Sequence, residues 1–207
     1  MEQARLAELL ASKLCHDFMG PMTAMMHGLE LIKQQDVGDQ EALSLLENGL
    51  VKAHAKLDFY RHSLGNALGG EGEAQLSAGA AAAAALYATY KAKLDWQAPD
   101  LRLPAGAIRV VLNVLMIAND CLPKGGTVLL TGSAGEISVA ATGERAKLRP
   151  DVAAGLAGGF SEDGYQALNV QPFLTALLAR QAGIEIAIVE EPGSKIEFTL
   201  KSAHFTA

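Results

Sequence analysis

The sequence has few cysteines, which many extracellular proteins use for disulfides, and no long apolar run of the kind that membrane-spanning helices need. Its 207 residues include two cysteines, Cys15 and Cys121, both among apolar neighbours, and this usage favours a reduced, cytoplasmic protein. The longest apolar run, 80–88, is mostly alanine and far too short to span a membrane. The N-terminus leads directly into an amphipathic pattern, so we expect neither a signal peptide nor a membrane partner.

Positive charge is also scarce. Seventeen Lys and Arg residues against 23 Asp and Glu residues give a net charge of −6. A nucleic-acid-binding protein needs a basic face, so we expect no nucleic-acid partner. Half of the residues are hydrophobic, which is enough for a chain of this length to bury the core of one large domain or two small ones.

Two amphipathic helices are predicted in a first domain, residues 1–68. In residues 1–35 the apolar positions that share a helical face are Ala11, Leu14, Phe18, Pro21, Met22, Met25, Leu29 and Ile32. Residues 36–39 break the pattern, and Asp39 is a suitable N-cap for the next helix. The second helix carries a heptad seam of Leu43, Leu46, Leu50, Ala53, Leu57, Tyr60 and Leu64. A lone antiparallel hairpin cannot cover both seams, so we expect a homodimer with a four-helix bundle.

The periodicity changes after the linker-like stretch 65–73, and a second domain is predicted over 75–207. Helices are expected over 77–93, 104–122 and from Asn169 to Gly183. Strands are expected over 93–98, 127–131, 136–141, 184–189 and 195–200, and an irregular loop over 151–165. This order predicts an α/β sandwich of helices on a mixed sheet, so the whole chain is of the α+β class.

One histidine lies on the polar side of the first helix. His16 is roughly 160° from the core face on a helical wheel. An exposed histidine is often only solvated, but a neutral imidazole is also a good phosphoryl acceptor near neutral pH. Asp17 is placed to fix the imidazole tautomer or to accept its proton. Gly20 and Pro21 are expected to loosen or kink the helix one turn later.

These residues resemble a known motif. His16-Asp17-x-x-x-Pro21-x-Thr23 resembles the phosphoacceptor box of sensor histidine kinases, which opens a dimerising helical hairpin. The second half resembles the kinase ATP-binding domain. The segment from Arg109 through Asn113 to Gly126 resembles its asparagine box and exit turn, and the segment from Gln171 to Leu200 resembles its last helix and closing hairpin. The resemblance covers nearly the whole chain.

The departures from the kinase pattern are as informative as the matches. Ile117 stands where the kinases carry a second asparagine for magnesium, and 141–145 replaces the Asp-x-Gly-x-Gly motif for adenine. The glycine-rich phosphate loop is missing before Asn169. A kinase shape with an intact Leu14-Cys-His-Asp17 and an eroded nucleotide site closely resembles the ChpT-type histidine phosphotransferases.

The resemblance implies a dimer that relays a phosphoryl group from the receiver domain of a hybrid kinase to those of response regulators. His16 is then the phosphoacceptor and Asp17 the orienting residue or proton acceptor. No cofactor or metal is implied for this chain, because the partner receiver supplies Mg²⁺. Gly20 replaces the side chain that orients a hydrolytic water in bifunctional kinases, which predicts weak phosphatase activity.

Receiver domains are expected to bind around the phosphoacceptor. The candidate residues are Ser12, Lys13, Met19, Gly20 and Thr23 near His16, and a basic cluster of Arg145, Lys147 and Arg149. For these residues the alternatives are solvated positions or, for methionine, the edge of the core. Two other functions stay open for the chain: an ATP-dependent histidine kinase core, and a dimeric scaffold that sequesters receivers without catalysis.

Overall fold

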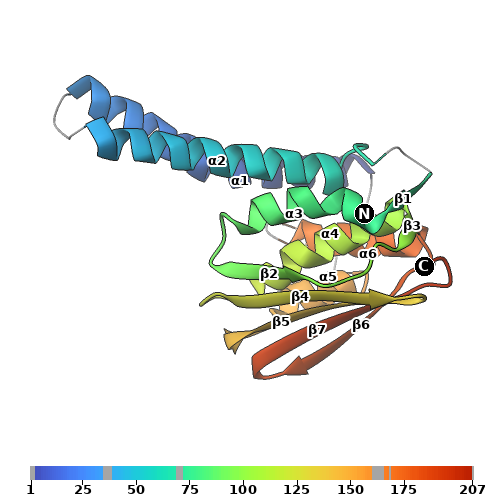
Figure 1. Cartoon of the computed structure of the whole chain (residues 1–207). Coiled ribbons are helices and arrows are strands. Elements are labelled where there is room, and N and C mark those ends of the chain that lie inside the picture. The colour runs from blue at the N-terminus through green and yellow to red at the C-terminus, as the bar shows by residue number, and fades with distance from the viewer. Residues whose placement is uncertain (1–2, 35–38, 69–71, 160–165, 168, 207) are drawn as a thin grey trace.

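A long helical hairpin lies along the C-terminal part of the chain and projects beyond it (Figure 1). The computed structural model describes residues 3–34, 39–68, 72–159, 166–167 and 169–206. The hairpin consists of α1 (Gln3–Gln34) and α2 (Asp39–Ser63). The helix break expected at 36–38 lies outside the described residues, and so does the side chain of Asp39.

Two glycines set how closely the hairpin helices pack. A Cβ atom on Gly28 would lie 2.9 Å from the Ala42 carbonyl oxygen, and one on Gly49 would lie 2.9 Å from the Pro21 carbonyl oxygen. Only glycine permits backbones to approach this closely. These contacts set the register of the hairpin, with residues 21–28 of α1 alongside residues 42–49 of α2.

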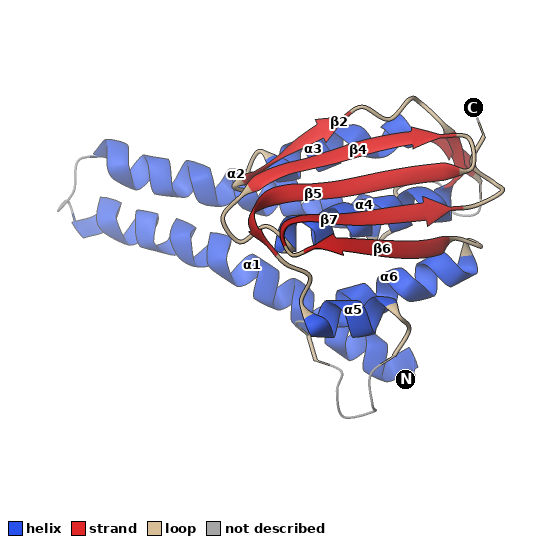
Figure 2. Ribbon diagram, turned by 90° about the horizontal axis from the view of Figure 1, so that it is seen from below, coloured by secondary structure: helices blue, strands red, loops and turns tan. Residues whose placement is uncertain are grey.

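The C-terminal part is a layer of helices on a sheet (Figure 2). Its elements in chain order are β1 (Glu73–Gln75), the 3₁₀ helix η1 (Leu76–Gly79), α3 (Ala80–Tyr87), β2 (Ala92–Trp96), β3 (Arg102–Pro104), α4 (Ala105–Asp120), β4 (Gly126–Ser133), β5 (Glu136–Ala146), α5 (Pro150–Leu156), α6 (Val170–Gln181), β6 (Glu185–Glu191) and β7 (Gly193–Lys201). The main sheet has the order β2-β4-β5-β7-β6. β2 pairs parallel to β4, and the other neighbours are antiparallel. β1 and β3 form a separate two-stranded sheet.

The core lies between this sheet and the helices. Alternate strand residues face it, so that Val139 of β5 and Ile196 and Phe198 of β7 are fully buried. α4 is apolar on nearly every side and lies in the middle of the helix layer, as expected of a helix that is buried all round. Among the described helices, none has both the length and the apolar content that a membrane span requires.

The expected α+β class, with a helical hairpin before an α/β sandwich, is confirmed. Two local expectations are wrong. The helix predicted over 77–93 ends at Tyr87, because a turn at 88–91 leads into β2. The loop predicted over 151–165 contains α5, which begins with Pro150 at its first position. The linker-like stretch 65–73 overlaps β1 at Glu73 alone, where that residue pairs with the distant Pro104.

Candidate functional site

The candidate site lies on α1, where the helix continues through Pro21 without a break. The His16 side chain is 67% exposed, as its place on the helical wheel predicts. Its Nδ1 atom lies 3.3 Å from Oδ1 of Asp17. The other ring nitrogen, Nε2, is therefore the nitrogen left for chemistry with a partner.

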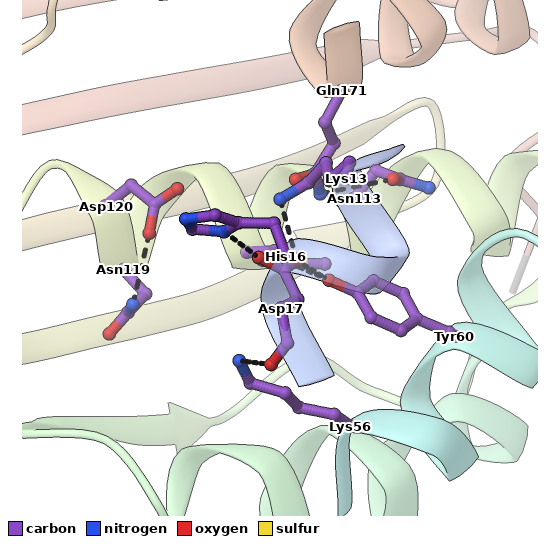
Figure 3. A network of polar contacts seen from close by, with 10 residues as sticks. Lys13, His16, Asp17, Lys56, Tyr60, Asn113, Asn119, Asp120 and Gln171 are labelled. Atoms are coloured by element: carbon purple, nitrogen blue, oxygen red, sulfur yellow. Dashed lines mark hydrogen bonds and ion pairs between the residues drawn. The ribbon is translucent and has the colours of Figure 1, made fainter. Parts of the chain in front are cut away.

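Asp17 accepts hydrogen bonds from both helices of the hairpin, in addition to its contact with His16 (Figure 3). Lys13 donates to Oδ2 over 2.8 Å, and the hydroxyl of Tyr60 on α2 donates to the same oxygen. The Asp17 side chain is only 15% exposed. Burial alone would raise the pKa of Asp17, but the hydrogen bonds from Lys13 and Tyr60 and the charge of Lys13 outweigh it and hold the pKa below its usual value. Asp17 is thus an ionised acceptor and a weak base.

Lys56 of α2 contacts the main chain of the same residue. Its ammonium group donates to the Asp17 carbonyl oxygen over 2.8 Å. Burial lowers the pKa of Lys56, and the carboxylates of Asp17 and Asp120 oppose that shift. Lys56 and Tyr60 are one turn apart, so a single face of α2 supplies both contacts.

The site is joined to the C-terminal core. The Tyr60 hydroxyl lies 3.9 Å from Sδ of Met116 on α4, and the Phe18 ring meets the Tyr60 ring edge-on with centroids 6.3 Å apart. Burial and the hydrogen bond to Asp17 raise the pKa of Tyr60, and the charge of Asp120 acts in the same direction. Asp120, at the end of α4, therefore lies close enough to the site to act on it electrostatically.

A buried amide network ties α2 to the helix layer. Asn113 of α4 is fully buried, and its Nδ2 donates to the Ser63 carbonyl over 2.9 Å and to the Arg109 carbonyl over 2.8 Å. Gln171 of α6 donates to Oδ1 of Asn113 over 3.4 Å. The residue that resembles the asparagine of the kinase box thus holds the end of the hairpin in place.

The predicted receiver-binding residues fall into two groups. Ser12, Met19, Gly20 and Thr23 are exposed on α1 around His16, whereas Lys13 is half-buried against Asp17. Gly20 borders open space, since a Cβ at this position would have no atom within 4 Å apart from its chain neighbours and the backbone of its own helix.

The basic cluster lies at and just after the end of β5. Arg145, Lys147 and Arg149 are exposed, and the Lys147 amide donates to the Cys121 carbonyl, which places this segment beside the end of α4. Arg145 pairs with Glu144 and Arg149 with Asp151, so acidic neighbours reduce the charge of the cluster. These positions remain candidates for receiver contact.

Sequence reasoning missed three residues of the site. Tyr60 was expected in the hairpin seam, and Lys56 and Asp120 were not singled out. One signal for Lys56 was available: Pro21 cannot donate a hydrogen bond to the Asp17 carbonyl four residues earlier. Within the described ranges, no group of three or more His, Cys, Asp or Glu side chains is placed to hold a metal ion.

An exposed imidazole with a carboxylate near Nδ1, carried by a helical hairpin, is an arrangement suited to proteins that accept a phosphoryl group on histidine. The sequence model of the family described as "Histidine phosphotransferase C-terminal domain" matches residues 76–194. The "Protein phosphotransferase ChpT" of Brucella abortus strain 2308 is 32% identical over 189 residues, which cover 88% of this chain and 89% of that protein. A solved structure titled "1.7 Angstrom Structure of a Bacterial Phosphotransferase" superposes with a TM-score of 0.87 at 28% identity, covering 97% of this chain and 98% of the other.

The chain therefore belongs to the ChpT-type histidine phosphotransferase family, and it is a phosphotransferase.

Proposed function

We propose that the protein relays a phosphoryl group between receiver-domain aspartates through a phosphohistidine at His16, without binding ATP. The observation that carries this proposal is the geometry of His16: its Nδ1 faces the Asp17 carboxylate while the ring is 67% exposed. A proton held on Nδ1 leaves the Nε2 lone pair free to attack a phosphorus atom presented by a partner.

The transfer needs no proton movement. Nε2 attacks the aspartyl phosphate of the first receiver in line, the Nε2–P bond forms, and the P–O bond to the receiver aspartate breaks. The ring then carries a positive charge, which the Asp17 carboxylate stabilises through Nδ1–H. A carboxylate oxygen of the second receiver attacks the phosphorus, the Nε2–P bond breaks, and the imidazole is neutral again. The lowered pKa of Asp17 favours this orienting role over that of a proton acceptor.

Mg²⁺ is assigned to the receiver in this proposal. The ion neutralises the equatorial phosphoryl oxygens during transfer, so this chain need supply only the nucleophile and its position. The two free cysteines suit the reducing cytoplasm, where we place the relay.

Three positions of the C-terminal part argue against ATP. Asn113 is fully buried and its amide group is already hydrogen-bonded on both sides. Ile117 is 2% exposed and packs in the hydrophobic core, where it cannot serve as a magnesium ligand. Ala141 of β5 stands at the first position of the replaced adenine motif, where it is fully buried and has no carboxylate to bind adenine.

The uncovered apolar face of the hairpin supports a homodimer. Met22 and Leu29 on α1 and Leu43, Leu50 and Leu57 on α2 are exposed at seven-residue spacing. The register of the hairpin places Met22 level with Leu50 and Leu29 level with Leu43. A second hairpin laid on this face completes a four-helix bundle. Light scattering should show a dimer, and Leu50→Lys should shift it to a monomer; an unchanged dimer in this variant would contradict the placement.

The relay is tested with a receiver domain that carries a radiolabelled aspartyl phosphate, mixed with the purified protein in the absence of ATP. We expect label on this chain, its loss in His16→Ala, and its passage to a second, unlabelled receiver. No transfer from any of a panel of receivers would contradict the relay. Receivers that bind His16→Ala as tightly but never transfer label would favour the scaffold.

A further inference from the structure

Proline leaves a gap in the hydrogen bonding of α1 at the residue that orients the phosphoacceptor. In an α-helix the N–H of each residue donates to the carbonyl four positions earlier. Pro21 has no N–H, so it cannot serve the carbonyl of Asp17. Lys56 of α2 supplies the missing donor over 2.8 Å. The gap thus places a cation from the second helix directly beside the histidine segment.

Tyr60 completes a second contact from the same face of α2. Its hydroxyl donates to Oδ2 of Asp17, the oxygen that Lys13 also contacts. Two donors on Oδ2 leave Oδ1 to face His16 Nδ1 at 3.3 Å. Contacts with Phe18 and Met116 hold the Tyr60 ring, so its hydroxyl is presented from a packed side chain. α2 therefore holds Asp17 by its main chain and by its side chain (Figure 3).

We propose that Lys56 and Tyr60 are positioning residues for phosphotransfer. They hold Asp17 so that Oδ1 keeps the proton of His16 on Nδ1, and they thereby leave Nε2 unprotonated and directed outward. This inference rests on the proposed function, because the position of the proton matters only if Nε2 is the nucleophile. It assigns two residues of α2 to a site whose sequence motif lies entirely on α1.

The test separates chemistry from receiver docking by using a small donor. Phosphoramidate phosphorylates an imidazole directly: the Nε2–P bond forms, the P–N bond of the donor breaks, and ammonia leaves. The variants are Tyr60→Phe and Lys56→Met. Tyr87→Phe is the matched tyrosine control, since its hydroxyl donates to the Leu115 carbonyl in the core. Lys52→Met is the matched lysine control, one turn earlier on α2.

Two readouts are measured on each protein. One is kinetic: the rate at which phosphoramidate phosphorylates His16 is measured. For transfer from a phosphorylated receiver to His16, the maximal rate and the half-saturating receiver concentration are measured as well. The other is the tautomer of His16, read from ¹⁵N chemical shifts of labelled histidine and assigned by the signal that His16→Ala lacks among five histidines. The tautomer is read on folded protein, where a variant that is merely less stable keeps the Asp17 contact and the wild-type tautomer. A changed tautomer in a folded variant therefore distinguishes positioning from a loss of stability.

We expect wild type and both controls to show Nδ1–H at His16. In Tyr60→Phe and Lys56→Met the Nε2–H form should appear, and the phosphoramidate rate and the maximal receiver rate should fall about tenfold. The half-saturating receiver concentration should stay unchanged. A wild-type tautomer in both variants would overturn the inference, and so would a changed tautomer with unchanged rates. If phosphoramidate labels wild type but no receiver does, the relay fails while the positioning role still stands on the tautomer.

Discussion

The hairpin and the C-terminal part differ in where they put their apolar side chains. In the C-terminal part, apolar residues of α4 and the central strands are fully buried, Phe198 and Leu112 among them. In the hairpin, large apolar residues such as Met19, Met26 and Leu50 are exposed. An apolar surface of this kind marks a place where another protein binds. We therefore propose that the hairpin is the surface on which partners bind, and the C-terminal part is the packed body that holds it.

The polar residues show the same division. His16 on the hairpin faces solvent and is available to a partner, whereas Asn113 is buried and serves the architecture. Packing and buried hydrogen bonds such as those of Asn113 maintain the C-terminal fold. The hairpin thus carries an exposed polar group that a partner can reach, whereas the C-terminal part uses its buried polar group to hold the fold together.

The largest expected effect is the loss of chemistry without a loss of fold. His16→Ala should lower phosphoryl transfer at least about a thousandfold, because no other group replaces Nε2. Its unfolding free energy should change by less than about 0.5 kcal/mol, since the side chain is exposed. His27→Ala, at another exposed position of α1, is the control and should transfer normally. Label retained by His16→Ala would mean that the acceptor has been misassigned.

The next largest effect is a loss of stability in the C-terminal part. Phe198→Ala should lower the free energy of unfolding by about 3–5 kcal/mol, because it empties a fully buried position between sheet and helices. Met19→Ala, which is 64% exposed on the hairpin, should change it by less than about 0.5 kcal/mol. Chemical denaturation at one fixed protein concentration measures both. Equal losses in the two variants would remove the distinction between surface and body.

Much of this division could be predicted from the sequence. The side of α1 on which His16 lies follows from helical periodicity, and the closing hairpin follows from Glu191-Pro192-Gly193 between two alternating segments. Such features depend only on neighbours along the chain. The class of fold followed from the order of elements and from the resemblance.

The contacts across the fold could not be predicted in the same way. Lys56 and Tyr60 reach Asp17 only because Gly28 and Gly49 set the register of two packed helices, and no periodicity states that register. β1 pairs with β3 across a large sequence separation, and three-residue strands carry no pattern of their own. The glycines that follow α5 made this stretch resemble a loop, although Pro150 is typical of the first position of a helix.

A smaller loss of stability tests the structural role of the buried amide network around Asn113. Asn113→Ala should lower the free energy of unfolding by about 1–3 kcal/mol, because the Ser63 carbonyl and the Gln171 side chain lose their buried partner. Phosphorylation of His16 by phosphoramidate should be nearly unchanged below the melting temperature. If folded Asn113→Ala also showed a clear fall in the rate of His16 phosphorylation, Asn113 would take part in the chemistry.

The smallest effect concerns acid. The pKa of Asp17 is lowered in the folded chain, so its ionised form contributes stability above the usual carboxyl pKa, and that contribution is lost as the pH falls through the folded value. We expect about 1 kcal/mol of the acid-induced loss of stability below pH 4 to depend on Asp17. In Asp17→Asn the curve of stability against pH should be flatter by this amount. Identical curves would show that the contacts of Lys13 and Tyr60 do not stabilise the carboxylate.

The most direct test uses two labels in one sample. The protein is mixed with a receiver carrying ³²P on its aspartate and with ATP carrying ³³P on its γ-phosphate, and the label on His16 is counted. We predict ³²P on His16 and no ³³P, because in the proposed relay the hairpin accepts its phosphoryl group from a receiver and the C-terminal part binds no nucleotide. If ³³P appeared on His16 and ³²P did not, the result would contradict this prediction and identify an ATP-dependent kinase.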